Sequence, residues 1–399
     1  MPAAAYSHRT FDSIAQVDAT EWECVRSACN ASIATDPRFL AAVEASMKGG
    51  ERFWYIVVYD ETGAPAACAT VSAMTVDLLG FADPALARII RLTPLNFSRL
   101  RRAKLLIGGL PIGTGQHTLA LKEPAAGAQI LPVLDKVICE LASEIKADAI
   151  LYKEFAQGDL PWTAPLLDRG YLRLPTPPSY SLQPGFEDFA QYCAALRSHY
   201  RRQINLSKRK LRDGGCEIAI LTDPAEILRA YTPEVHALYH QMLDRAPLKM
   251  EVLPPELLHE LALRLDGQIE LLAIRKDSRI VAFASCLHAQ SAYYTMYGGL
   301  DYRLNHEFDL YFNLVYALIE HGLRKRAATI VFGMGSDAVK SRIGCYPEPL
   351  YVFVKGCGAL MSFMVRAAGR FLIAPEAAPP PFKIFKDEAV EHPQKSRGL

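Results

Sequence analysis

Residues 53–71 read Phe-Trp-Tyr-Ile-Val-Val-Tyr-Asp-Glu-Thr-Gly-Ala-Pro-Ala-Ala-Cys-Ala-Thr-Val, which is an apolar run, a polar turn and a second apolar run. Residues 270–285 repeat this pattern as Glu-Leu-Leu-Ala-Ile, then Arg-Lys-Asp-Ser, then Arg-Ile-Val-Ala-Phe-Ala-Ser. Apolar runs rich in β-branched and aromatic residues, separated by turn residues, predict a pair of antiparallel strands at each place. The chain is therefore predicted to contain one hairpin twice.

The duplication continues beyond the hairpins. A helical pattern over residues 130–145 leads into the apolar strand 149–152, and a helical pattern over 308–323 leads into 329–332. A strand reached through a helical crossover pairs in parallel with an earlier strand. The sequence thus predicts an α/β protein with a mixed sheet, built as two tandem copies of one unit. One large α/β domain with chance internal similarity stays open as the alternative.

Two proline-dense stretches, 174–185 and 374–381, divide the chain. Proline ends helices and donates no hydrogen bond to a sheet, so such stretches are typical of linkers and tails. We therefore expect a first domain over residues 1–184, a second over 185–374 and a polar tail over 375–399.

The composition limits the classes of function. Of 399 residues, 50% are apolar and 22% are charged, which is enough apolar material for packed cores and excludes a disordered chain. Lysine and arginine number 44 against 43 acidic residues, so a globally basic DNA-binding protein is excluded. The nine cysteines contain no Cys-x-x-Cys, which argues against a disulfide scaffold or a zinc site. With no signal peptide and no membrane span predicted, we expect a cytoplasmic protein without a bound metal.

Residues 186–215 carry an amphipathic helical pattern with one basic flank. At 100° per residue the cations share an arc of about 140°, and no acidic residue interrupts 197–212. These cations are Arg197, Arg201, Arg202, Lys208, Arg209 and Arg212, with Lys210 outside the arc. Such a row favours a polyanion, either CoA phosphates or an RNA backbone, and we predict that Arg201 and Arg202 bind donor phosphates. A solvated helix face is the alternative.

A second candidate segment is 293–302, Tyr-Tyr-Thr-Met-Tyr-Gly-Gly-Leu-Asp-Tyr. A strand is predicted to end at Gly298 and Gly299, where glycine allows backbone N–H groups to approach a ligand. The phenol of Tyr297 and the carboxylate of Asp301 are candidates for orienting or deprotonating an acceptor or protonating a leaving group. A tight turn flanked by core tyrosines is the alternative.

The third candidate segment is 332–342, Phe-Gly-Met-Gly-Ser-Asp-Ala-Val-Lys-Ser-Arg. An apolar strand ends in glycines and a short helix follows, which is where α/β proteins usually bind their ligands. Lys340 is predicted to stabilise a developing oxyanion or a phosphate, and Arg342 to assist in binding the donor. An ordinary surface lysine is the alternative.

Other signals are weaker. His236 and His240 have the i, i+4 spacing of a metal site but lack the glutamate of a zincin, so they are interpreted as an ordinary surface or core pair. No Gly-x-Ser-x-Gly nucleophile elbow occurs, and no cysteine has an evident partner histidine.

Taken in order, these segments resemble the FemAB-like branch of the GNAT acyltransferase superfamily. The resemblance rests on several stretches: Ala19-Thr-Glu-Trp-Glu, Asp36-Pro-Arg-Phe-Leu-Ala-Ala-Val-Glu, Gly108-Gly-Leu-Pro-Ile-Gly-Thr-Gly, the basic helix 189–212, the Tyr-Gly-Gly strand end and Lys340-Ser-Arg-Ile-Gly. It covers most of residues 8–355. The Gln/Arg-x-x-Gly-x-Gly/Ala loop of CoA-dependent members is replaced here by Gly299-Leu-Asp-Tyr-Arg-Leu-Asn-His-Glu-Phe.

The resemblance implies two tandem GNAT domains, with the second domain carrying the site. It implies transfer of an acyl or aminoacyl group to the amine of a small molecule or peptide, with acyl-CoA or aminoacyl-tRNA as co-substrate and no tightly bound cofactor. Direct aminolysis in a ternary complex requires a neutral amine and a donor to the oxyanion, but no protein nucleophile. The alternative is a non-catalytic module that holds an anionic ligand such as RNA or a glycan.

Overall fold

The computed structural model describes residues 6–29, 32–47, 49, 51–77, 102–246, 252–371 and 382–386. They form two compact units. The first draws on 1–176, 248–257 and 349–375, and the second on 177–247, 258–348 and 376–399. Of the predicted polar tail, only residues 382–386 are among those described.

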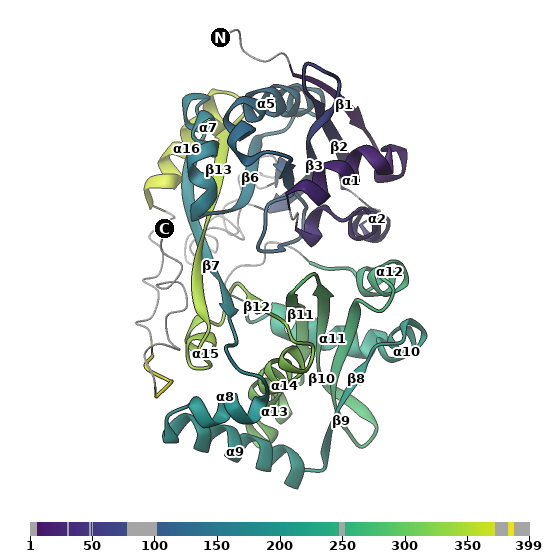
Figure 1. The fold of residues 1–399 in the computed structure, drawn as a ribbon, viewed down its shortest axis with the longest axis vertical. Coiled ribbons are helices and arrows are strands. Elements are labelled where there is room, and N and C mark those ends of the chain that lie inside the picture. The colour runs from purple at the N-terminus through teal and green to yellow at the C-terminus, as the bar shows by residue number, and fades with distance from the viewer. Residues whose placement is uncertain are drawn as a thin grey trace, which may run out of the picture. The chain divides into compact units, whose positions relative to one another are not determined.

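The first unit contains a mixed sheet with strand order β1-β2-β3-β4-β6-β13 (Figure 1). Its strands are β1 (Ser7–Phe11), β2 (Arg52–Tyr59), β3 (Pro65–Asp77), β4 (Arg102–Gly108), β5 (Leu119–Leu121), β6 (Ala149–Ala156) and β13 (Tyr346–Gly356). Its helices are α1 (Ala19–Ala28), α2 (Pro37–Ser46), α5 (Gly127–Glu144), α6 (Leu160–Thr163), α7 (Pro165–Asp168) and α16 (Ala359–Phe371). Among the described strands of this sheet, only β4 and β6 pair in parallel, and β5 pairs with β3.

The second unit has the sheet order β8-β9-β10-β11-β12-β7. Its strands are β7 (Leu172–Leu182), β8 (Cys216–Leu221), β9 (Ile269–Lys276), β10 (Arg279–Ala289), β11 (Ala292–Leu300) and β12 (Thr329–Gly333). Its helices are α8 (Phe189–Ala195), α9 (Ser198–Asp213), α10 (Pro224–Ala230), α11 (Pro233–Leu243), α12 (Glu256–Arg264), α13 (Tyr302–Phe308), α14 (Leu310–Arg324) and α15 (Asp337–Ser341). Of the strands that the structure describes here, only β11 and β12 pair in parallel.

The two sheets have the same connectivity, which confirms the predicted duplication. The hairpin β2–β3 corresponds to β9–β10, and the parallel pair β4–β6 corresponds to β11–β12. The long crossover helix is α5 in one unit and α14 in the other. Each short helix before the last strand is followed by a glycine with positive φ, Gly170 or Gly344, which ends it as the sequence predicts.

The last strand of each sheet comes from the other half of the chain. Residues 350–356 of β13 pair with β6, and residues 180–182 of β7 pair with β12. The units are therefore not the two continuous stretches 1–184 and 185–374 that the proline-rich segments predict. Residues 177–182, which contain two of those prolines, form the end of β7 rather than a linker, and residues 180–182 pair with β12.

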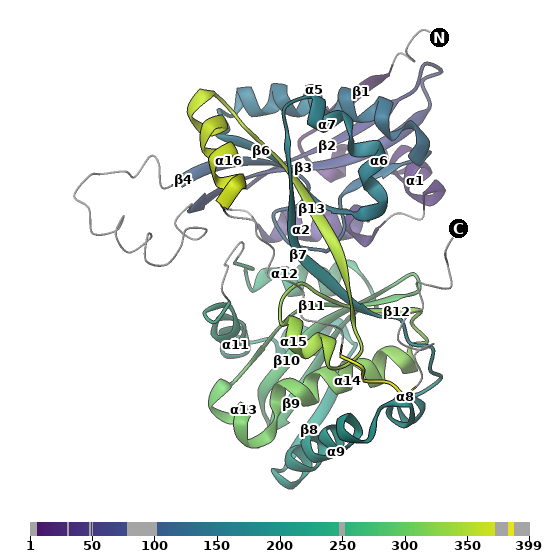
Figure 2. The same cartoon turned by 90° about the vertical axis from the view of Figure 1, so that its left-hand side faces the viewer.

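In the second unit, helices cover both faces of the sheet. On β10, Ala282 and Ala284 belong to an apolar cluster with Leu314 of α14, whereas Phe283 between them packs its ring against Tyr231 and Tyr297. Because side chains alternate along a strand, α14 and α11 lie on opposite faces. Figures 1 and 2 show α9 on the outer side of α13 and α14, so α9 belongs to the α14 face.

The predicted helix over 186–215 is two helices, because the chain is extended at Leu196 and Arg197. Leu196 forms a β-bridge with Phe385, and the Arg197 N–H donates to the carbonyl of Ile384. These partners come from a distant segment of the chain, so nothing local in the sequence indicates the break. The helix ends at Gly214 and Gly215 as predicted.

Candidate functional site

The two parallel strands of the second unit separate. β11 pairs with β12 through three residue pairs only, of which Tyr294–Val331 is the last. β11 then continues to Leu300 paired with β10, while β12 ends at Gly333 paired with β7. From residue 295 onward, β11 thus has no strand partner on its β12 side among the strands that the structure describes.

Backbone groups of β11 face this separation. The N–H of Asp301 donates to the Val281 carbonyl on β10. Because peptide groups alternate along a strand, those of Gly298 and Leu300 point the other way, toward the side that β12 has left. Peptide N–H groups with no strand partner can bind the carbonyl oxygen of a substrate.

Two hydroxyl groups on this part of β11, Thr295 Oγ1 and Tyr297 Oη, are buried without a well-formed hydrogen bond to the described residues. Tyr297 is 9% exposed and packs against the Tyr239 ring of α11. Burial raises the pKa of Tyr297 well above its ordinary value, and the neighbouring Tyr231 phenol raises this pKa further. A buried, neutral phenol next to a second phenol is suited to exchanging a hydrogen bond with a substrate.

Gly298 and Gly299 lie within β11 rather than at a break in the chain, which corrects the predicted end of the strand. A Cβ on Gly299 would overlap the backbone of Leu238 and Tyr239 in α11, and one on Gly298 would lie 2.6 Å from the Phe283 carbonyl. Their first role is therefore steric, because they allow α11 and β10 to pack closely on β11.

Asp301 is the N-cap of α13 rather than an unengaged base. Its side chain accepts from the Arg303 N–H and forms a 2.7 Å ion pair with the Arg303 guanidinium. Hydrogen bonding from Arg303 lowers the pKa of Asp301. A carboxylate that is held in its charged form this way is a weak acceptor for an amine proton.

Lys340 is buried in α15, with 6% of its surface exposed. Its Nζ donates to the carbonyls of Gly333 and Met334, both at 2.8 Å, and lies over the Tyr180 ring. Burial lowers the pKa of Lys340 to about 8, which nearby Cys345 and Asp337 oppose. The ammonium therefore holds the loop after β12, at the end of the strand that separates from β11.

That loop has a special backbone. Gly333, Gly335 and Ser336 all have positive φ, which is costly for serine. Arg342, at the end of α15, is exposed and stacks on the Phe382 ring. The Arg342 guanidinium thus lies against an aromatic ring at the protein surface.

On α9 the predicted row of cations is partly neutralised. Lys208 pairs with Glu320 and Lys210 with Asp309, both from the α14 region, at 2.9 and 3.0 Å. Arg212 pairs with its neighbour Asp213. The other cations of this helix face form no ion pair with the residues that the structure describes. They are Arg197, Arg201, Arg202 and Arg209.

The structure does not bring Arg201 and Arg202 to Tyr297. Both arginines line an open hollow of about 580 Å³ whose lining residues all belong to α9, and α9 packs on the α14 face of the sheet. Tyr297 packs beneath α11 on the opposite face. The prediction that Arg201 and Arg202 hold a donor reacting at Tyr297 therefore has no geometric support in the second unit.

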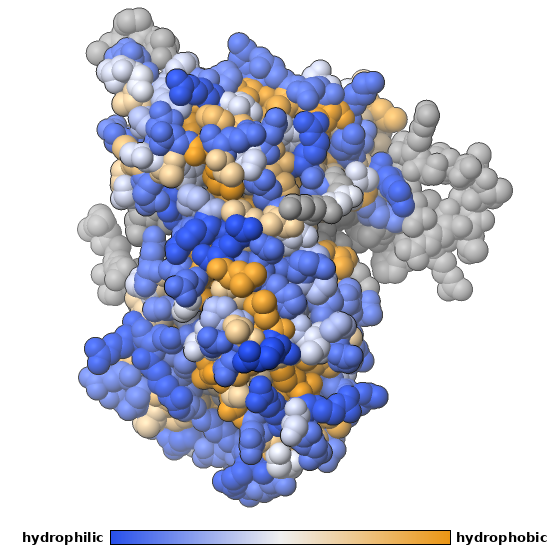
Figure 3. Space-filling view, turned by 90° about the vertical axis from the view of Figure 1, so that its right-hand side faces the viewer, coloured by the Kyte–Doolittle hydropathy of each residue, from blue (hydrophilic) through white to orange (hydrophobic). Residues whose placement is uncertain are grey.

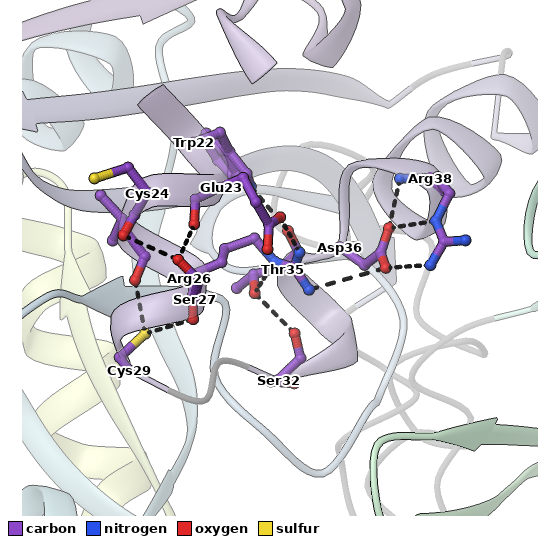
Figure 4. A network of polar contacts seen from close by, with 11 residues as sticks. Trp22, Glu23, Cys24, Arg26, Ser27, Cys29, Ser32, Thr35, Asp36 and Arg38 are labelled. Carbon is purple, nitrogen blue, oxygen red and sulfur yellow. Dashed lines mark hydrogen bonds and ion pairs between the residues drawn. The ribbon is translucent and has the colours of Figure 1, made fainter. Parts of the chain in front are cut away.

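A larger hollow, of about 790 Å³, lies in the first unit beside α1 and the start of α2. Figure 4 shows its polar groups paired with one another: Arg26 contacts Glu23 and Thr35, and Asp36 binds the Arg38 guanidinium while capping α2. Hydrogen bonding from Arg38 helps to lower the pKa of Asp36 against the effect of burial. These polar groups bind one another, so few of their donors and acceptors are left for a ligand.

Sequence reasoning missed an aromatic cluster beneath α11. The Tyr231 Oη lies 2.9 Å from His236 Nδ1, and the His236 ring packs against those of Tyr239 and His240. The spacing in the sequence grouped His236 with His240. In the structure His236 Nδ1 contacts the hydroxyl of Tyr231, which lies just before α11. A tyrosine five residues before a histidine, across a helix start, gives no periodic signal.

The described residues contain no cluster of three or more metal-ligating side chains, and no helix among them is long and apolar enough to cross a membrane. Figure 3 shows the face of the second unit that carries α10 and α12, which hydrophilic side chains mostly cover. Apolar side chains lie between them, and Leu263 of α12 is 59% exposed.

Comparison with known proteins finds a family whose model matches part of the second half. Residues 198–341, which include the separated strands, match the family described as "Acetyltransferase (GNAT) domain". No curated protein sequence matches the chain.

Three solved structures share the fold along nearly their whole length. FemX is 11% identical with a TM-score of 0.54, over 90% of this chain and 100% of that one. A tandem GNAT protein from the clavulanic acid biosynthesis pathway is 11% identical with a TM-score of 0.52, over 89% and 99%. The C-terminal domain of a putative lysylphosphatidylglycerol synthetase from Agrobacterium fabrum is 12% identical with a TM-score of 0.50, over 88% and 96%. The chain thus has the fold of these solved structures, one of which is a tandem GNAT protein, and its residues 198–341 match a GNAT acetyltransferase domain.

Proposed function

We propose that the second unit transfers an acyl group from an activated donor to an amine, and that the reaction takes place where β11 and β12 separate. The single observation that carries this proposal is the separation itself. After Tyr294 and Val331 the two strands no longer pair, and the next residues of β11 include Thr295 and Tyr297, whose hydroxyls are buried. The match of residues 198–341 to a GNAT acetyltransferase domain supports the same class of chemistry.

In this proposal the peptide N–H groups of Gly298 and Leu300 bind the donor carbonyl and stabilise the tetrahedral oxyanion after the amine attacks. The Tyr297 phenol exchanges a proton with the reacting amine. Lys340 fixes the loop after β12 through the Gly333 and Met334 carbonyls, which keeps the two strand ends apart. Lys340 is thus a positioning residue here.

The donor we propose is an acyl-CoA thioester. A thioester carbonyl needs no metal for aminolysis, and an extended pantetheine-like chain can lie along an unpaired strand edge. Aminoacyl-tRNA is the other donor that the resemblance implies, and it is an outcome of the same test. Arg201 and Arg202 have no part in the donor site we propose, since α9 lies on the other face of the sheet.

A second candidate is a non-catalytic module that binds a polyanion through α9. The observation that favours it is a row of three arginines with no ion pairs in the described part of the chain, the half-buried Arg201 and the exposed Arg202 and Arg209. This alternative predicts binding that weakens steeply with salt and no turnover.

The test is release of free thiol from acetyl-CoA in the presence of a panel of primary amines, with transfer from aminoacyl-tRNA followed in parallel. We expect amine-dependent turnover with at least one donor, lost in Tyr297→Phe but retained in Arg201→Ala/Arg202→Ala. Salt-sensitive binding of RNA without turnover on either donor would overturn the acyltransferase proposal and support the binding module.

A further inference from the structure

Residues 382–386, called the C-terminal segment below, belong to the second unit and lie along the break between α8 and α9. The Arg197 N–H donates to the carbonyl of Ile384 at 2.8 Å, and the Lys386 N–H donates to the carbonyl of Ala195 at 2.9 Å. These bonds run in both directions between the two stretches, as in an antiparallel strand pair. The C-terminal segment is therefore docked through its backbone.

The side chains of the C-terminal segment are docked as well. Ile384 and Phe385 are 1% and 2% exposed. The Phe385 ring packs against the rings of Phe186 and Tyr192, at centroid distances of 5.6 and 6.1 Å. Burial of two large apolar side chains stabilises the docked position of the segment.

The same phenylalanine ring lies on the turn that follows α15. A Cβ on Gly344 would be 2.6 Å from the Phe385 ring and 3.0 Å from the Ile384 side chain. The neighbouring carbonyl, that of Ile343, accepts from the Tyr192 hydroxyl at 3.0 Å. The turn after α15 is thus held by the C-terminal segment and by the tyrosine against which that segment packs.

Hydrogen bonds connect this turn to the loop after β12 through one residue. The carbonyl of Lys340 accepts from the N–H groups of Ile343 and Cys345, at 3.2 and 3.1 Å. The Lys340 Nζ donates to the carbonyls of Gly333 and Met334. Because α15 has only five residues, its own hydrogen bonds do not fix it, and it depends on such contacts.

We propose that the C-terminal segment is a positioning element of the reaction site: by holding the turn after α15, it keeps Lys340 bound to the loop after β12. Phe385 is the positioning residue in this scheme, since its ring lies on the turn and touches no reacting atom. The effect on acyl transfer rests on the proposed function, whereas the effect on Lys340 does not.

The first test labels lysines and needs no turnover. The full-length protein is treated with sulfo-N-hydroxysuccinimidyl acetate at pH 8, and acetylation of each lysine is followed by peptide mass spectrometry. Burial lowers the pKa of Lys340 to about 8, so much of this amine is neutral at that pH, and slow labelling in the wild type reports burial. In Phe385→Ala we expect Lys340 to be labelled at least about 10-fold faster, because its turn opens locally.

Two controls separate this local effect from a general loosening of the unit. Leu211→Ala removes a buried side chain of the same apolar cluster at the other end of α9, and it should leave labelling of Lys340 at the wild-type rate. Lys276 donates to the Gly214 carbonyl and not to the loop after β12, so its labelling should be unchanged in Phe385→Ala.

Thermal melting checks that the variants are folded. If Phe385→Ala does not fold, Phe385→Leu keeps an apolar side chain and should give a smaller increase at Lys340. Unchanged labelling of Lys340 in the folded Phe385 variant would overturn the proposal. An equal increase at Lys276, or the same increase at Lys340 in Leu211→Ala, would also overturn it.

The second test is a double-mutant cycle measured by turnover with the donor and amine that the wild type uses. Lys340→Met removes the amine and keeps a long side chain. We expect Phe385→Ala to lower kcat by about 10-fold, and Phe385→Ala/Lys340→Met to be no slower than Lys340→Met, because both changes act through one amine. Independent, additive losses would overturn the positioning role. If the wild type transfers no acyl group while Lys340 labelling rises as expected in Phe385→Ala, the proposed function fails and the hold of the C-terminal segment on Lys340 stands.

Discussion

The parallel strand pair is closed in the first unit and open in the second. In the first, β4 stays paired with β6 up to its last residue, Gly108, opposite Tyr152. In the second, β11 runs six residues past its last pair with β12. The connectivity is the same in both units, but the two parallel pairs differ beyond their last paired residues.

Side chains and a loop fill the position in the first unit. The Tyr152 ring lies against Gly108 so closely that a Cβ there would be 2.6 Å from it. The loop after β4 is fixed by Lys153, whose Nζ donates to the Ile112 carbonyl, and by Glu154, which accepts from the Thr114 N–H. The comparison teaches that the duplicated fold by itself supplies no site. An open strand edge beside buried, unpartnered hydroxyls occurs in the second unit.

The largest effect on stability is expected from a substitution that obstructs the close packing of α11 on β11. In Gly299→Ala the new methyl group would overlap the α11 backbone, which cannot move without the helix, so we expect a loss of more than about 3 kcal/mol of stability. Gly108→Ala in the first unit meets only the Tyr152 ring and should cost less. Gly185→Ala, with nothing within 4 Å, is the control. Thermal and urea unfolding measure the loss of stability in each of the three variants. An equal loss of stability in Gly299→Ala and Gly185→Ala would contradict the expected order.

The next prediction distinguishes an effect on the rate of catalysis from an effect on protein stability. Tyr297→Phe should lower kcat by about 10²-fold and leave the melting temperature unchanged or raised, since it removes a buried hydroxyl without a hydrogen bond. Tyr152→Phe in the first unit should do the reverse, because the Tyr152 hydroxyl donates to Asp135 at 3.2 Å. Its activity should be retained and its stability should fall by about 1 kcal/mol. Paired kinetics and melting curves test this, and loss of turnover in Tyr152→Phe would contradict the assignment of the site.

A smaller effect depends on pH. Glu270 is buried on β9 and contacts Tyr293, His321 and Lys325. Burial opposes its ionisation, but His321 and Lys325 lower the pKa of Glu270 from 4.5 to about 2. Its stabilising contribution is therefore present above pH 4.5 and is lost as the pH falls toward 2.

The residue matched to Glu270 in the first unit is the apolar Phe53, which has no such dependence. Amide exchange followed unit by unit should show the second unit opening first on acidification. Glu270→Gln should remove this difference between the units. Simultaneous opening of both units in the wild type would show that Glu270 does not control it.

The smallest effect is expected on α9. Arg201→Ala/Arg202→Ala removes one half-buried and one exposed side chain from the other face of the sheet, so the melting temperature should change little and kcat with a small thioester should stay within about twofold of wild type. Only binding of RNA should weaken, with a shallower dependence on salt. A large drop in kcat would contradict this prediction and would indicate that these arginines belong to the donor site.

The fold was largely predictable because its signals are local. The hairpins at 53–71 and 270–285, the crossover helices and the glycines after the short helices all arise from periodicity and turn chemistry. The break of the basic helix at Leu196 was not predictable, since its partners lie at residues 384–386. The exchange of β7 and β13 depends likewise on contacts between distant parts of the chain.

The candidate site was predictable only in part. The segments around Tyr297 and Lys340 were identified, and both lie on or next to the separated strands. The countercharges of α9 come from Glu320 and Asp309, which lie 112 and 99 residues from their partners, so the sequence did not show that these cations are paired. Which face of the sheet a helix covers is set by tertiary packing, which periodicity alone does not show.

The central claim is that an acyl donor binds along the open edge of β11. Hydrogen–deuterium exchange with and without the donor that supports turnover tests it most directly. We expect protection of the amides of residues 295–301 and 333–337, and none in β4 or β6. Protection confined to α9 or to the first unit would contradict the account.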